Sequence, residues 1–295
     1  MRASVCLRAF AVTFAVLSAA CADDSGPAKT DRGSAGKSFD QSFADVEAYP
    51  VFASSEIVVG RSRLLIGLLN DEDAPIASPD ISMHVAFYDL SESDERPAFE
   101  TDAEFLDTGP RGLYVTYPEF DAAGEWGAEV TLEGEVEETV RAGFEVTKKP
   151  MTPALGERVP ASRTPTAGSR KAIAKISTDD DPDPRFYETS VHEAVRAGRP
   201  FVLTFATPKF CTSAVCAPTL DIVKGAAGDW RDVTFIHVEV YENLDDPSNL
   251  KPVAAVKEWN LPSEPWVFVV DEGRLVAKYE GSVSTEELGR ALEDL

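Results

Sequence analysis

Two cysteines five positions apart, Cys211 and Cys216, are the residues of this 295-residue chain best placed to do chemistry. They follow an apolar, β-prone run at residues 201–206, and a helical pattern begins just after the second cysteine. A cysteine at the point where a strand gives way to a helix lies near unpaired backbone N–H groups and the positive end of the helix dipole. That setting stabilises a thiolate, which is the reactive form of cysteine. The motif therefore predicts sulfur redox chemistry.

The spacing of this pair limits how it can form a disulfide. On a regular helix, residues five apart have Cα atoms about 8–9 Å apart, whereas a disulfide needs less than about 7 Å. A bridge is expected if regular helix begins near Ala217 or Pro218, so that residues 212–215 form a turn. If the helix instead begins at Cys211, oxidation has to unwind its first turn. Either way, we expect the reduced and oxidised forms to differ locally.

The N-terminal residues 1–21 predict export from the cytoplasm. Arg2 and Arg8 precede an apolar run, residues 9–20, that is too short to span a membrane. The segment LSAAC resembles a bacterial lipobox and implies a lipid anchor on Cys21. Ordinary signal cleavage after Ala22 is the alternative. Both interpretations predict an extracytoplasmic protein, and the first predicts a membrane-anchored lipoprotein.

Export leaves few cysteines in the mature protein. The chain has four. Cys6 leaves with the signal peptide, and Cys21 is either lipidated or removed. Cys211 and Cys216 then remain as one close pair in an oxidising compartment, where a disulfide is expected at least part of the time.

The composition bounds the class of partner. The formal net charge is −23, from 51 acidic and 28 basic residues. This balance argues against nucleic acid and against an anionic membrane surface as the partner. The hydrophobic content of 43% is enough for globular cores, and the length suits two domains.

The composition changes along the chain and predicts four regions after the signal. Residues 22–45 are expected to be a disordered tether, residues 46–148 a β-sandwich, residues 149–182 a proline-containing linker, and residues 183–295 an α/β domain. The expected strands of the β region are 56–59, 64–69, 82–88, 112–117, 126–132 and 139–146. The run Ala123-Gly124-Glu125-Trp126 resembles small immunoglobulin-like domains of exported bacterial proteins, and its partner is unknown.

The order of elements in residues 183–295 carries a second resemblance. We expect a helix from the Ser190/Glu193 capping box to Gly198, a strand at 201–206, and a helix after the cysteines. A strand at 233–240, a helix at 253–259, a hairpin of strands 266–270 and 275–279, and a last helix capped by Ser284 and Glu287 follow. This order is similar to the thioredoxin fold. The apolar strand entering Phe210-Cys211, the run Ser263-Glu264-Pro265-Trp266 and the hairpin ending at Gly281 carry the likeness.

The thioredoxin resemblance implies a mechanism and a site. Cys211 would attack a partner's disulfide and Cys216 would resolve the mixed disulfide. Pro265 stands where thioredoxins have a cis-proline and would shape the substrate groove. The other implied groove residues are Glu264, Trp266 and Phe210. The resemblance implies protein thiols and disulfides as partners, with no metal and no organic cofactor. The expected function is thiol–disulfide exchange on proteins outside the cytoplasm.

Three features depart from the thioredoxin pattern. The motif is C-x-x-x-x-C in place of C-x-x-C. Thr204, or Phe205 without a loop insertion, stands where thioredoxins carry a buried proton-transferring Asp. Glu264 would place a carboxylate near Cys211, which opposes thiolate formation. These features favour a slower or differently specific exchanger.

Two other functions stay open at this point. Peroxiredoxins of the bacterioferritin-comigratory type often share the C-x-x-x-x-C spacing with Thr after the first cysteine, although Pro208 and Thr204 stand where their peroxide-binding Thr and Pro would be. A non-catalytic surface module with a structural Cys211–Cys216 disulfide also fits. Copper handling is disfavoured because His237, in an expected strand, is the one downstream histidine.

Overall fold

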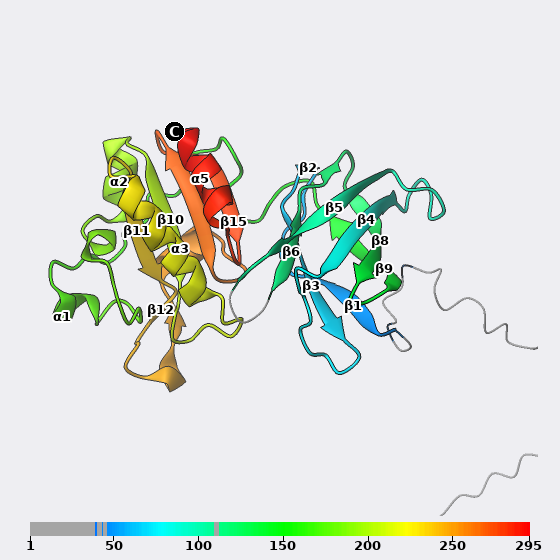
Figure 1. Cartoon of the computed structure of the whole chain (residues 1–295). Helices are drawn as coiled ribbons and strands as arrows, with labels where there is room; N and C mark the ends of the chain where they lie inside the picture. Colours follow the sequence, from blue (N-terminus) through cyan, green and yellow to red (C-terminus); the bar gives the residue numbers. More distant parts are fainter. Residues whose placement is uncertain (1–38, 40–42, 44–45, 109–111) are drawn as a thin grey trace, which may run out of the picture. The chain divides into compact units, whose positions relative to one another are not determined.

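The computed structural model describes residues 39, 43, 46–108 and 112–295. The expected signal peptide, lipobox and Cys21 lie outside the described residues. The described residues belong to one compact unit, residues 35–295. The chain is mostly β, with one large antiparallel sheet and a smaller sheet that carries helices (Figure 1).

The larger sheet has seven antiparallel strands in the order β1-β3-β6-β5-β4-β8-β9. The strands are β1 (Ala48–Phe52), β3 (Leu64–Asn70), β4 (Ile81–Asp89), β5 (Phe99–Leu106), β6 (Leu113–Thr116), β8 (Gly124–Gly134) and β9 (Glu138–Val146). A separate short pair joins β2 (Gly60–Arg61) to β7 (Glu119–Phe120). Alternation explains the strands: in β4, Met83 and Val85 are buried while His84 between them is exposed.

The large sheet curls around one main apolar core. Strand β5 pairs with β6 on one side and β4 on the other, so hydrogen bonding runs unbroken through all seven strands. The two edge strands β1 and β9 meet, and the rings of Phe52 and Phe144 lie 5.1 Å apart. The expected β region is therefore realised as one continuous curled sheet, and its likeness to immunoglobulin domains stays a prediction.

Three details of the expected strands change. The strand expected at 56–59 is wrong, because that stretch contributes only an isolated bridge from Val58 to Thr147. Strands β1 and β5 were not expected. Strand β1 contains Pro50, which an edge strand tolerates. Strand β5 alternates between half-buried and exposed residues, but its exposed positions are acidic, and so many charged residues are not typical of a strand.

The smaller sheet has the order β11-β10-β14-β15. Its strands are β10 (Phe201–Ala206), β11 (Thr234–Glu239), β14 (Trp266–Asp271) and β15 (Arg274–Glu280). Strand β11 runs parallel to β10, whereas β14 and β15 are antiparallel. The helices are α2 (Val191–Ala197), α3 (Cys216–Asp229), α4 (Ala254–Glu258) and α5 (Thr285–Glu293), and a short pair joins β12 (Tyr241–Glu242) to β13 (Lys251–Pro252). The expected order of elements from residue 190 onward is confirmed.

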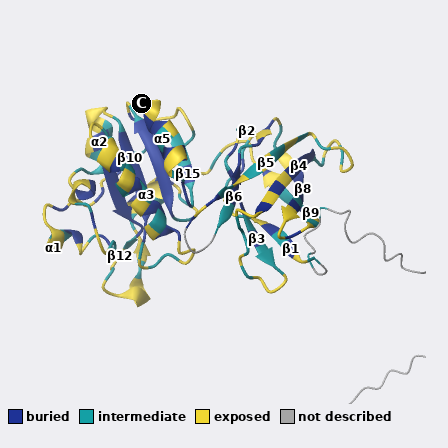
Figure 2. Cartoon of the chain, viewed as in Figure 1, coloured by how far each residue is buried: buried dark blue, intermediate teal, exposed yellow. Residues whose placement is uncertain are grey.

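The strands of the smaller sheet are largely buried (Figure 2), and each face of the sheet packs against a different apolar cluster. One face carries Val202 and Val267 and packs against α3 and α5. The opposite face carries Phe205 and Phe268 and packs against α2 and α4. Strand residues that alternate in sequence therefore separate into two cores, which is why β14, and β10 apart from Thr204, read as apolar runs. The site described below lies on the face that α3 covers.

Residues 149–182 include α1 (Arg170–Ile173), and a 3-10 turn, η1 (Pro184–Tyr187), follows them. A second 3-10 turn, η2 (Pro247–Asn249), lies between β12 and β13. Val159, Ala167 and Ile173 from this stretch are buried in the clusters on the smaller sheet. The stretch also forms a backbone bridge from Arg158 to Arg274 of β15. It therefore belongs in large part to the packed structure around that sheet.

No helix among the described residues is long and apolar enough to cross a membrane.

Candidate redox site

Cys211 and Cys216 form a disulfide at the start of α3. Their Cα atoms are 6.0 Å apart, within the range that a disulfide requires. Helix α3 begins at Cys216, and residues 212–215 form the turn that leads into it. Pro218 therefore lies in the first helical turn, where proline is tolerated. This is the arrangement in which the wide cysteine spacing still permits a bridge.

The two sulfurs differ in exposure. Cys216 is 0% exposed, whereas Cys211 is partly exposed. The backbone N–H of Cys216 donates to Cys211 Sγ at 3.3 Å, and Ser213 Oγ lies 3.2 Å from the same sulfur. The N-terminus of a 14-residue helix thus directs a donor at Cys211. A negative charge on Cys211 would be stabilised there, and an incoming molecule can reach only Cys211.

The redox loop, residues 207–215, is held in place by a neighbouring strand. Thr178 Oγ1 accepts a hydrogen bond from the Lys209 N–H at 3.2 Å. Thr178 in turn donates through its N–H and its hydroxyl to Glu239 Oε2, at 2.8 and 2.7 Å. Glu239 at the end of β11 therefore fixes one side of the loop. The Lys209 ammonium lies over the Phe210 ring, 5.5 Å from its centre, so it has a neighbour other than Cys211.

Backbone conformation in the loop is unusual at one position. Ala214 has φ of 61°, in the left-handed region. A side chain with a Cβ atom is disfavoured there by about 1–2 kcal/mol. The turn between the cysteines is therefore held by its surroundings, among them the disulfide.

The Glu264–Pro265 peptide is cis, as expected from the run that contains it. Pro265 is buried and Glu264 is half-buried. Burial raises the pKa of the Glu264 carboxyl, and the negative charge of Glu239 raises it further. The expected effect of the Glu264 carboxylate on a Cys211 thiolate stays a prediction.

Trp266 does not face the redox loop. It is 1% exposed and belongs to the cluster on the α2 and α4 face, stacked on Phe268. Its Nε1–H donates to Ser263 Oγ at 3.1 Å. The small exposed part lines a cavity of about 570 Å³ beside β15 that contains no residue of the redox loop. The expectation that Trp266 lines the substrate groove is therefore corrected, because alternation along β14 turns its side chain to the other face. Phe210 is half-buried beside Cys211 in the chain.

A row of buried polar side chains lies on the α3 face of β10 and β11. Register pairs Thr204 with His237 and Ala206 with Glu239. Burial lowers the pKa of His237. A neutral ring fits its contacts, Tyr187 Oη at 2.8 Å from Nδ1 and the Ala206 carbonyl at 3.1 Å from Nε2.

Several buried oxygens of this row have no hydrogen-bond partner within the described structure. They are Thr204 Oγ1 and Glu239 Oε1, and Thr207 Oγ1 at the start of the redox loop is in the same state. Glu239 is only 4% exposed, and it is the residue that the sequence analysis missed. The sequence shows only that Glu239 stands two positions after His237 in the same strand, which puts both side chains on one face. Among the described residues, no group of three or more His, Cys, Asp or Glu side chains could hold a metal ion.

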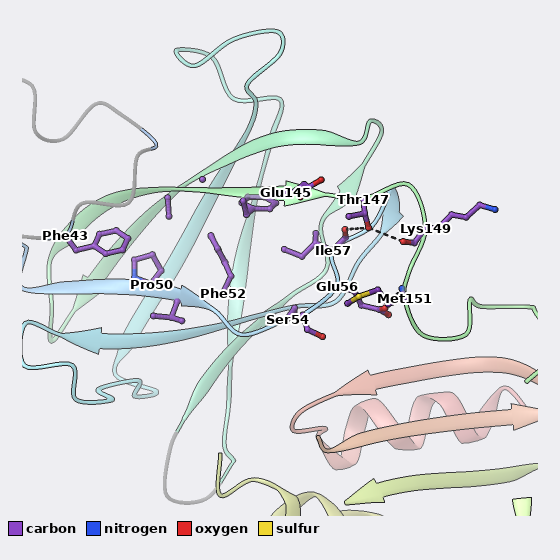
Figure 3. A pocket seen from close by; sticks show the side chains of 15 residues that line it. Phe43, Pro50, Phe52, Ser54, Glu56, Ile57, Glu145, Thr147, Lys149 and Met151 are labelled. Atoms are coloured by element: carbon purple, nitrogen blue, oxygen red, sulfur yellow. Dashed lines mark hydrogen bonds between the residues drawn. The ribbon is translucent and has the colours of Figure 1, made fainter. Parts of the chain in front are cut away.

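A separate cavity of about 610 Å³ opens between β1 and β9 (Figure 3). Its walls are largely apolar, and Phe52, Ile57 and Met151 line it. The carboxylate of Glu56 at its end is already bound, by Lys278 and by the Thr152 hydroxyl. The cavity holds no cysteine, so the redox chemistry lies elsewhere.

Comparisons with known proteins find likeness in structure alone. No protein-family model and no curated protein matches the chain. An oxidised mitochondrial thioredoxin 3 of Saccharomyces cerevisiae is 20% identical with a TM-score of 0.27, and the match covers 35% of this chain and 84% of that one. A β-glucuronidase of Parabacteroides merdae is 15% identical with a TM-score of 0.24, covering 38% of this chain and 17% of that one. Such low TM-scores say nothing about activity.

Proposed function

We propose that this protein is a thiol–disulfide oxidoreductase of the thioredoxin-like type that acts on protein disulfides. The disulfide at the start of α3, with Cys211 reachable and Cys216 enclosed, carries the proposal. A purely structural bridge has no need for this asymmetry or for a helix N–H directed at the reachable sulfur. We also propose that the curled sheet is an immunoglobulin-like domain, whose role and partner are unknown.

In the proposed exchange, the electrons and protons that one protein loses are taken up by the other. The Cys211 thiolate attacks one sulfur of a partner disulfide, a mixed disulfide forms, and the partner's other sulfur leaves as a thiolate. Cys216 gives up its proton and attacks Cys211 Sγ, so the Cys211–Cys216 bond forms and the second partner sulfur leaves. The two leaving thiolates take the two protons that the cysteines lose. The partner disulfide is reduced by two electrons, and the chain's dithiol is oxidised by two. An oxidised chain runs the same steps in reverse with a partner dithiol.

The chain itself offers the trap that tests this function. Cys216→Ser leaves an attacking thiol with no resolving partner, so mixed disulfides with protein substrates should accumulate and disappear on reduction. Cys211→Ser is the matched control, because its remaining thiol is fully buried and should capture nothing. Capture by neither variant, while an alkylating reagent labels Cys211 in the first, would contradict the proposal. If the chain instead turns over hydrogen peroxide with a thiol reductant, its function is that of a thiol peroxidase and not of a disulfide oxidoreductase.

We further propose that the exchange takes place outside the cytoplasm, on a protein anchored to the membrane by a lipid on Cys21. The support is the sequence alone: a charged start, a short apolar run and the LSAAC segment. Metabolic labelling with a fatty acid, compared between the natural chain and Cys21→Ala, tests the anchor. Label on the natural chain but not on the variant is the expected result, and an unlabelled natural chain would contradict the anchor.

A further inference from the structure

Two acidic residues lie at the end of the sheet from which the redox loop departs. We call Glu239 and Glu264 the carboxylate pair. Glu239 ends β11 and is paired in register with Ala206, the last residue of β10. Phe205 is paired with Trp266 on the other side of β10, so Pro265 and Glu264 follow at the same end of the sheet. The pair therefore flanks the strand that leads into the redox loop.

Neither member of the pair is neutralised by the chain. No Lys, Arg or His side chain forms an ion pair with Glu239 or Glu264 among the residues that the structure describes. Glu239 is 4% exposed and its Oε1 has no hydrogen-bond partner. Buried carboxylates are ordinarily paired or fully hydrogen-bonded, because an uncompensated charge in a low-dielectric site is costly. A cation bound beside the carboxylate pair would therefore offset the cost of its uncompensated negative charge.

The electrostatics of neighbouring groups agree with this geometry. Burial raises the pKa of Glu264, and the charge of Glu239 contributes to the shift. The pKa of Tyr241 on β12 is raised as well, by burial and then by Glu264 and Glu239. The three groups therefore share one partly desolvated, negative environment beside Pro265.

We propose that this site selects protein disulfides with a Lys or Arg side chain next to the cysteine, which Glu264 receives while Glu239 supplies a fixed negative charge behind it. The inference rests on the proposed function and names its substrate class. Glu264 is the contact residue because it is half-buried and reachable, whereas Glu239 is enclosed. A metal ion is disfavoured as the occupant, because the described residues offer two carboxylates and no third ligand.

The whole chain favours the same class of partner. It carries 51 acidic and 28 basic residues, so a basic segment of a partner is attracted before it docks. Long-range attraction affects the rate of encounter, whereas the carboxylate pair acts only on a side chain within a few ångströms. Selection by the pair should therefore depend on where the basic residue stands in the partner, and not only on the partner's net charge.

Peptide disulfides test the inference with the reduced full chain. Three peptides would be matched except for one residue beside the cysteine, which is Lys, Gln or Glu, and a fourth would carry the Lys eight residues away. The rate constant of exchange should fall in the order Lys, Gln, Glu, with about fivefold between the first two. The peptide with the distant Lys should react like the Gln peptide.

Variants identify the residue responsible. Glu264→Gln should bring the ratio of the Lys-peptide rate to the Gln-peptide rate down to about one, and this ratio is the readout because the substitution can also change the rate common to all peptides. Glu239→Gln, which keeps the shape of the side chain, should reduce the preference in part. Glu272→Gln is the matched control, because it removes the same charge from the turn at the far end of the β14–β15 hairpin.

Different outcomes of these experiments count against the substrate preference and against the proposed oxidoreductase. Exchange with all peptides at equal rates would overturn the inference and leave the oxidoreductase standing. A Glu264→Gln variant that slows all peptides equally would also overturn it, because the residue would then act on the redox loop itself. No exchange with any peptide would instead count against the proposed function.

Discussion

Chemistry at the residue scale depends on a difference between two sulfurs of the same motif. Cys211 is partly exposed and receives the first N–H of α3, whereas Cys216 is enclosed by the helix that it begins. The sequence predicted the pair and the cis-proline run, because each depends on neighbours along the chain, and it left open whether a turn or a regular helix lies between the cysteines. It missed Glu239, because the approach of Glu239 to the redox loop depends on the register of β10 against β11 and on the Thr178 contact from a distant segment.

The left-handed residue between the cysteines predicts a change in redox behaviour. A β-branched residue fits left-handed backbone poorly, so Ala214→Val should destabilise the oxidised turn by a further ~1 kcal/mol. That corresponds to a reduction potential about 20 mV less negative. Equilibration with glutathione buffers measures the shift. Ala214→Gly is the matched control and should not become easier to reduce. An unchanged potential in the Val variant would show that the turn does not constrain the disulfide.

The half-buried carboxyl of Glu264 predicts a pH dependence of stability. In the folded chain the pKa of Glu264 is raised by burial and then by the negative charge of Glu239 of β11. The charge of Glu264 in turn helps to raise the pKa of Tyr241 of β12. A raised carboxyl pKa means that the folded state binds the proton more tightly than the unfolded state, so stability is lost as pH rises through this range. Glu264→Gln should therefore be more stable than the natural chain at pH 7 and equal to it near pH 3. Thermal unfolding at both values measures this, and a variant less stable at pH 7 would contradict the account.

Helix ends were the elements most reliably predicted from sequence. In α2, Ser190 Oγ accepts from the Glu193 N–H and Glu193 reaches back to the Ser190 N–H, and Gly198 ends the helix with φ of 63°. Such capping residues act within four positions of each other, so their spacing alone predicts the helix. Strand β1 and the curl of the large sheet depend on pairing between distant segments, and local patterns did not predict them.

The cap on α2 gives a prediction for one element. Ser190→Ala removes the side-chain acceptor of the Glu193 N–H and should lower the free energy of unfolding by about 1 kcal/mol. Thr189→Ala, one residue earlier, is the control and should change it by less than half as much. Denaturant unfolding of the full chain provides the measurement. Equal effects of the two substitutions would mean that the cap adds nothing to stability.

At the scale of the whole molecule, a buried ion pair joins residues that are far apart in the sequence. Arg63 donates to both carboxylate oxygens of Glu287 on α5, at 2.6 and 3.0 Å, and to the carbonyls of Glu280 and Ser282. Burial alone would raise the pKa of Glu287, but the hydrogen bonds from Arg63 and Tyr117 hold it below its usual value. No local sequence pattern predicts the contact between Arg63 and Glu287, which are more than two hundred residues apart.

Removal of Arg63 should therefore leave a buried charge without its partner. Arg63→Ala should cost on the order of 3 kcal/mol at pH 7. A lowered carboxyl pKa contributes stability that is lost as pH falls through it, so the difference from the natural chain should shrink in acid. Arg96→Ala, at an exposed position, is the control for the loss of one positive charge. A cost that is the same at pH 7 and pH 3 would show that the ion pair contributes nothing.

The reduction potential of the Cys211–Cys216 pair in the full chain tests the proposed function most directly. An exchanger should equilibrate with glutathione or dithiothreitol buffers at a potential between about −270 and −180 mV, the range from thioredoxin to protein disulfide isomerase. A potential below about −300 mV would identify a structural disulfide and would contradict the oxidoreductase.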